Sequence, residues 1–89
     1  MNTINITFHK KTEKPKPGTL CLVFFDRVLR ARTCWYLDNT DEDVKEFGDG
    51  EGFYRDNEPM SEGAIKLEDI FGWISLKELD NLVKNTKGN

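Results

Sequence analysis

The stretch that decides the fold reads TLCLVFF at residues 19–25, DR at 26–27 and VLRARTCWYL at 28–37. Both long runs are rich in aromatic, β-branched and other apolar residues, and a polar pair separates them. Two such runs with a tight connection are typical of a β-hairpin. The sequence therefore predicts an antiparallel hairpin that turns at Asp26 and Arg27.

Strict alternation along the two runs predicts the faces of this hairpin. One face is apolar throughout and carries Leu20, Leu22, Phe24, Leu29, Ala31, Thr33 and Trp35. The other carries Cys21, Val23, Phe25, Val28, Arg30, Arg32, Cys34 and Tyr36. A two-residue error in register would leave both sets intact, because side chains alternate with period two.

Weaker signals on either side extend the sheet. Ile4, Ile6 and Phe8 alternate with polar residues, as in a half-buried strand. GFYR at 52–55 and DIFGWI at 69–74 indicate two further short strands.

A C-terminal helix is predicted at about residues 76–86. Ser75 and Glu78 have the spacing of a capping box, in which the serine hydroxyl accepts from the third helical amide and the glutamate reaches back to the serine amide. An apolar stripe follows at helical spacing, formed by Leu76, Leu79, Leu82 and Val83.

Together these elements predict an α+β fold: a mostly antiparallel sheet of about four or five strands with one C-terminal helix packed on it. At 89 residues the chain is expected to form a single domain, residues 1–89. No apolar run approaches the roughly 20 residues of a membrane helix. The start of the chain has no signal-peptide pattern, and only two cysteines occur. We therefore expect a soluble protein of the cytoplasm.

The sequence offers no set of residues for catalysis, a metal or a cofactor. His9 is the only histidine, and no local motif supplies it with a nucleophile. Cys21 and Cys34 would be diagonal neighbours in the expected register, which suits neither a disulfide nor a zinc site. The carboxylates at 38–43 lack the glycine and glutamate of a calcium loop, and those at 48–52 would repel a phosphate. We predict a non-enzyme without metal or cofactor.

The charges are unevenly distributed. Residues 1–37 carry seven Lys/Arg and two Asp/Glu, whereas residues 38–89 carry six and fourteen. Residues 38–52 are predicted to be an acidic loop, with carboxylates at Asp38, Asp41, Glu42, Asp43, Glu46, Asp49 and Glu51. Closely spaced carboxylates repel one another, so we expect this surface to bind a basic protein. The alternatives are a loop that is only solvated and a homodimer in which the basic half of a second copy neutralises it.

Arg30, Arg32 and Tyr36 predict a different, basic face that could hold single-stranded nucleic acid, extended by the N-terminal lysines. The pI of about 5.1 favours the protein-binding hypothesis, because nucleic-acid-binding domains usually exceed a pI of about 9.

A set of short motifs runs through Glu13, Pro15, Pro17-Gly18, Leu20-Cys-Leu-Val23, Trp35-Tyr36 and Phe71-Gly-Trp-Ile-Ser-Leu76. The chain thereby resembles, over residues 8–37 and 70–76, a family of short phage and prophage proteins that form a domain of unknown function. Members of that family typically close on a His-Trp-Met-Pro-Leu-Pro stretch. Here the family's opening tryptophan is missing, and the capped helix replaces the closing prolines.

The resemblance implies a mobile-element origin and a compact β-rich fold, but no activity. The expected function is a non-catalytic protein-binding module that acts on a basic host protein through its acidic surface. A nucleic-acid-binding protein is the first alternative, and a small enzyme or nucleotide-binding protein is the second.

Overall fold

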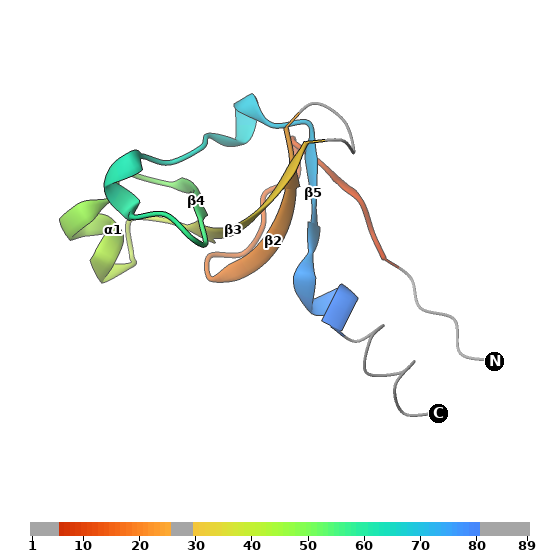
Figure 1. Cartoon of the computed structure of the whole chain (residues 1–89), viewed down its shortest axis with the longest axis horizontal. Coiled ribbons are helices and arrows are strands. Elements are labelled where there is room, and N and C mark those ends of the chain that lie inside the picture. The colour runs from red at the N-terminus through yellow and green to blue at the C-terminus, as the bar shows by residue number, and fades with distance from the viewer. Residues whose placement is uncertain (1–5, 26–29, 81–89) are drawn as a thin grey trace.

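A computed structural model of the chain describes residues 6–25 and 30–80 and has a five-stranded antiparallel sheet (Figure 1). The strand order is β1-β5-β2-β3-β4, and every neighbouring pair is antiparallel. The strands are β1 (His9–Lys10), β2 (Thr19–Phe24), β3 (Ala31–Leu37), β4 (Gly52–Arg55) and β5 (Gly72–Ser75). Residues 76–80 are helical and pack on the sheet. The predicted α+β class is thus confirmed.

The β2–β3 hairpin exists, with a register two residues away from the expected one. Leu20 pairs with Trp35 and Cys21 with Cys34, whereas the expected turn would place Leu20 opposite Thr33. The predicted partition into two faces survives this shift, as period-two alternation requires. The turn itself lies outside the described residues.

The more deeply buried face is the mixed one, not the face that the sequence shows as apolar throughout. Its core holds Cys21, Val23, Cys34, Tyr36, Phe53, Ile70 and Trp73. On the opposite face Trp35 is 39% exposed. Ile65 and Leu67 pack against the core because residues 60–70 run from the β4 side of the sheet to β5 (Figure 1). The sequence predicts no element for residues 61–68, so it could not show which face would be covered.

Two aromatic contacts fix the core. The Tyr36 and Phe53 rings meet edge to face with centroids 4.9 Å apart. At the other side of the sheet the His9 ring stacks on Trp73 at 4.1 Å, and the indole Nε1 of Trp73 donates to the Glu13 carbonyl over 2.8 Å. Such aromatic pairs stabilise beyond their buried area, by about 0.5–1.5 kcal/mol.

The predicted N-terminal strand is wrong for its described part. Ile6 and Phe8 precede β1, which covers only His9–Lys10. Phe8 packs against other aromatic side chains instead: its ring centroid lies 5.5 Å from that of Phe24 and 5.8 Å from that of Phe71. A Cβ at Gly72 would come within 2.6 Å of the His9 carbonyl oxygen and 2.3 Å of the Phe8 ring, so the close approach of the backbone at this position requires glycine. Ile4 lies outside the described residues.

The acidic segment is not a continuous loop, because it contains helix α1 (Glu42–Phe47). Two 3-10 turns follow β4, η1 (Met60–Glu62) and η2 (Leu67–Asp69), in a stretch for which the sequence predicted no element. The last strand accordingly begins at Gly72 rather than at residue 69. In the part of the chain described, no helix has the length and apolarity needed to cross a membrane.

The C-terminal helix starts where predicted, and its cap differs from a capping box. The Ser75 hydroxyl accepts from the Lys77 amide over 3.3 Å, at the second helical position rather than the third. Glu78 accepts from the Thr7 amide over 3.0 Å, so this carboxylate ties the helix to the N-terminal segment. Leu79 is half-buried, and residues 81–86 of the predicted helix lie outside the described residues.

Candidate functional site

Helix α1 turns the acidic segment into an organised surface beyond the β4 edge of the sheet (Figure 1). Val44 anchors it, with only 2% of its surface exposed. The neighbouring residues Glu42, Asp43 and Glu46 are all exposed, and the Glu42 carboxylate lies 3.7 Å from the Lys45 ammonium group. Of the seven predicted carboxylates, these three form the part of the segment that a partner can reach most directly.

Two other predicted carboxylates, Asp41 and Asp38, accept hydrogen bonds within the acidic segment itself. Asp41 is the N-cap of α1, accepting from the Asp43 and Val44 amides over 2.9 and 3.1 Å. Asp38 accepts from the Thr40 hydroxyl over 2.5 Å, and the hydroxyl and amide of Thr40 lower the pKa of this carboxyl. The self-repulsion of the segment is therefore partly relieved by hydrogen bonds that the chain supplies.

Glu51 joins the acidic segment to the core. Its carboxylate accepts from the buried Tyr36 hydroxyl and pairs with the Lys14 ammonium group, which lies 2.7 Å away. These two donors lower the pKa of Glu51, with Lys14 contributing most. Burial and the neighbouring Glu51 charge raise the pKa of the Tyr36 phenol. The charges of Lys14 and Glu51 are thus used in contacts within the molecule.

Asp49, the seventh predicted residue, lies in a turn that backbone contacts hold in place. The Tyr54 hydroxyl accepts from the Asp49 amide over 2.8 Å and donates to the Gly50 carbonyl over 2.5 Å. The Lys66 ammonium group donates to the Asp49 carbonyl over 2.7 Å. The Asp49 side chain itself is exposed at the margin of the acidic surface.

Phe47 is a surface residue that the sequence analysis missed. Its side chain is 57% exposed at the end of α1. It borders a hollow of about 420 Å³ that is lined by Asp43, Phe47, Glu58, Pro59, Met60 and Ser61. An aromatic residue in an otherwise charged run was the available signal, but only the helix shows that it points outward. We call Glu42, Asp43, Glu46, Phe47 and Glu58 the acidic face.

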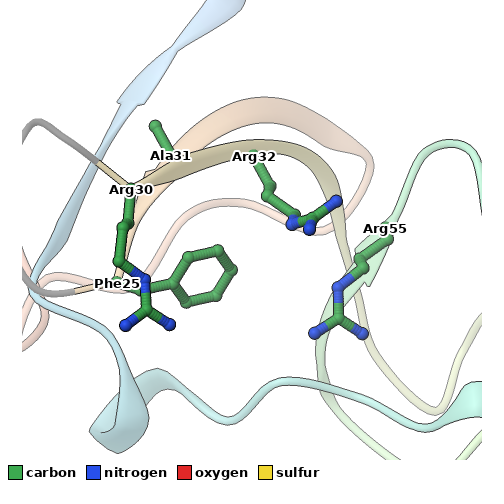
Figure 2. Close-up of a pocket in the computed structure, with 5 residues that line it drawn as sticks. All are labelled: Phe25, Arg30, Ala31, Arg32 and Arg55. Carbon is green, nitrogen blue, oxygen red and sulfur yellow. The ribbon is translucent and has the colours of Figure 1, made fainter.

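The predicted basic face is only partly assembled. Arg30 and Arg32 do lie together, at the open end of the sheet face that carries the core (Figure 2). Tyr36 does not join them: it is 1% exposed and bonded to Glu51, so it cannot stack on a nucleobase. Lys14 is paired with Glu51 as well. The basic track expected for an extended strand of nucleic acid is thus interrupted.

Arg55 completes a cluster that the sequence did not predict. Arg30, Arg32 and Arg55 line one pocket of about 390 Å³, together with Phe25 and Ala31. The pairing of Cys34 with Arg55 brings β4 beside β3 and makes Arg55 a diagonal neighbour of Arg32. Arg55 lies 23 positions after Arg32 in the chain, so only the strand pairing could reveal this neighbourhood. We call this the arginine pocket.

The remaining candidates for chemistry have structural contacts. The His9 Nδ1 atom lies 2.8 Å from a Glu13 carboxylate oxygen, which lowers the pKa of that carboxyl. Cys21 and Cys34 are free thiols and fully buried, and burial raises their pKa values to about 12 and about 11. Among residues 6–25 and 30–80, no three His, Cys, Asp or Glu side chains are grouped to hold a metal ion.

Comparison of the chain with protein families, with curated proteins and with solved structures finds no match.

Proposed function

We propose that this chain is a non-catalytic binding module whose acidic face takes up a basic segment of another protein. The observation that carries the proposal is the position of Phe47. An exposed aromatic side chain borders a hollow that is also lined by the carboxylate residues Asp43 and Glu58. Aromatic residues are enriched at interfaces, where they supply binding energy, while rim charges set association rate and orientation.

The chemistry of the hollow defines the partner. Asp43 and Glu58 contribute negative charge, and Phe47, Pro59 and Met60 contribute apolar surface. A segment with lysine or arginine next to an apolar side chain would satisfy both. The phage-type resemblance favours a host protein as its source, and we place the encounter in the cytoplasm. The structural roles of His9, Cys21 and Cys34 favour this proposal over an enzyme.

Affinity capture from a cell lysate, followed by measurement of association rates, tests the proposal. Reversing charge in the pair Asp43→Lys and Glu46→Lys should slow association steeply at low salt and leave the fold intact, because both side chains are exposed. Phe47→Ala should speed dissociation instead. The matched control is the pair Glu68→Lys and Asp69→Lys, which changes net charge equally on the exposed η2 turn.

The proposal fails if the partner associates with the Asp43 and Glu46 variant as fast as with the wild type. It also fails if the η2 control slows association equally, because net charge alone would then be responsible. Sedimentation of the purified chain over a range of concentrations examines the homodimer. Self-association that the acidic-face variant abolishes would identify a second copy as the partner.

A further inference from the structure

We propose that the arginine pocket binds a phosphate group carried by a small organic molecule. This site adjoins the acidic face, because Glu58 of that face pairs with Arg55 of the pocket. Figure 2 shows the side chains of Arg30, Arg32 and Arg55 on the same side of the sheet as the Phe25 ring, around an open space.

Register places the three arginines together. Arg30 directly precedes β3 and Arg32 lies in it, and the two side chains line the same pocket. Arg55 lies on the same face of β4, diagonal to Arg32, and diagonal neighbours in a sheet are about 7–8 Å apart. Long side chains at such positions can converge on one bound group. The sheet, rather than a loop, holds two of the three in position.

The positive charge of the pocket favours a highly charged anion. The guanidinium groups of Arg32 and Arg55 line the same pocket and repel one another, and among the described residues Arg32 forms no ion pair. Glu58 offsets part of the charge of Arg55, whose Nε lies 3.6 Å from a Glu58 carboxylate oxygen. Burial raises the pKa of the Cys34 thiol, and the charges of Arg55 and Arg32 oppose that rise. A bound anion would relieve this concentration of positive charge.

Donor geometry favours phosphate over carboxylate. Each guanidinium presents five N–H donors in a planar fork that matches the oxygens of phosphate and carboxylate. A terminal phosphate has three free oxygens and a charge of about −1.5 to −2, so it can engage several arginines at once. A carboxylate has two oxygens and one charge, which a single arginine satisfies.

Size and the Phe25 ring favour a small molecule over a polymer. The pocket volume of about 390 Å³ falls in the usual range for ligand sites, about 300–1,000 Å³. Phe25 is half-buried and lines the pocket, which gives the organic part of the ligand an apolar wall. Because Tyr36 is buried and Lys14 is paired with Glu51, the basic surface does not continue as a track for nucleic acid.

Calorimetric titration of the full chain tests the proposal, with pyrophosphate and a nucleoside triphosphate as probes. We expect saturable binding of both, weakened about 10- to 100-fold by Arg32→Gln or Arg55→Gln, the range for loss of a charged hydrogen bond. Arg32→Lys should recover only part of the affinity, because lysine lacks the fork. Lys45→Gln removes an exposed cation on α1 and should change nothing.

Two further titrations distinguish a small phosphorylated molecule from a nucleic acid as the ligand. Because the Phe25 ring is proposed to contact the organic part of the ligand, Phe25→Leu should weaken binding of the nucleoside triphosphate and leave binding of pyrophosphate unchanged. An oligonucleotide without a terminal phosphate should bind less tightly than either probe. Urea midpoints of each variant verify that the fold is retained.

The proposal is overturned if neither probe binds saturably. It is also overturned if Lys45→Gln weakens binding as much as Arg32→Gln, which would indicate general charge attraction. Preferential binding of the unphosphorylated oligonucleotide would likewise overturn it, in favour of a nucleic-acid surface.

Discussion

Tyr36 and Glu51 connect the core of the sheet to the acidic segment through one hydrogen bond, with Lys14 as the counter-charge. Tyr36→Phe keeps the ring contact with Phe53 and removes only the hydroxyl. Hydrogen bonds to charged groups contribute about 1.5–3 kcal/mol, and less where the acceptor is partly exposed, as Glu51 is. We expect the variant to lose about 0.5–1.5 kcal/mol of unfolding free energy in urea titrations. An unchanged midpoint would contradict the assignment.

The same contact predicts a pH dependence. Lys14 and Tyr36 lower the pKa of Glu51 in the folded state below its ordinary value of 4.5. The resulting stability is present above that ordinary value and is lost as the pH falls through the lowered folded pKa. Glu51→Gln should therefore be less stable than the wild type near neutral pH, and the difference should shrink in acid. Glu46→Gln, at an exposed position on α1, should leave the free energy of unfolding near neutral pH close to that of the wild type.

The two cysteines occupy directly opposed positions on β2 and β3, not the diagonal ones expected from the sequence. Both are fully buried, with pKa values raised to about 12 and about 11. Only the thiolate is nucleophilic, so we expect both thiols to react slowly with a disulfide reagent in the native protein and rapidly in denaturant. Ser61→Cys, at an exposed position of η1, supplies a thiol that should react at once. Equal rates at all three sites would contradict the burial.

At the scale of elements, Asp41 shows why the acidic segment cannot be treated as uniform. Its carboxylate caps α1 through the Asp43 and Val44 amides. Asp41→Ala should cost about 0.5–2 kcal/mol of unfolding free energy, the usual effect of losing an N-cap. Asp41→Asn should cost much less, because asparagine also caps well. A charge reversal of the whole segment would therefore perturb the helix, and Asp41 must be spared when partner binding is measured.

The C-terminal helix gives a second test of an element. Ser75→Ala removes the acceptor of the Lys77 amide and should cost about 0.5–2 kcal/mol. Leu79 is only half-buried by the described part of the chain, so Leu79→Ala should cost less than the roughly 2–5 kcal/mol of a fully buried leucine. Urea unfolding of both variants measures the two effects. If neither changes the midpoint, the helix contributes nothing to the stability of the sheet.

The elements could be predicted because their signals are local. Alternation revealed β2 and β3, and the Ser75 signal revealed the start of the helix. The covered face could not be predicted, because it depends on the path of residues 60–70. The short helix α1 was missed because its charges suggest solvation more strongly than its six residues suggest a helix. In the case of the covered face, tertiary contact overrides the local pattern.

The candidate sites were predictable to different degrees. Glu42, Asp43 and Glu46 were found from charge density alone. Phe47 needed the orientation of α1, and Arg55 needed the pairing of β3 with β4. Tyr36 was assigned to the wrong environment, because strand alternation gives its face but not which face is buried. Residues that function together across strands are not adjacent in sequence, so pattern analysis recovers only part of such a site.

At the scale of the whole molecule, Glu58 lies between the two proposed sites. It lines the hollow beside Phe47, and its carboxylate pairs with Arg55 of the arginine pocket over 3.6 Å. A basic partner that engages Glu58 would compete with Arg55 for it. Glu58 would then neutralise Arg55 less, and the positive charge of Arg55 would attract an anion in the pocket more strongly. The partner should therefore strengthen anion binding in the pocket. By linkage, a bound anion should strengthen partner binding by the same factor.

Glu58→Gln tests this coupling without a partner in hand. Both side chains of the pair are about one-third exposed, and exposed ion pairs contribute about 0.2–1 kcal/mol. Removing the carboxylate should therefore tighten pyrophosphate binding about 1.5- to 5-fold in calorimetric titrations at low salt, with less effect at high salt. Glu62→Gln, an exposed carboxylate on η1, should leave the affinity unchanged. If Glu58→Gln weakens pyrophosphate binding or matches the Glu62 control, Glu58 does not couple the acidic face to the arginine pocket.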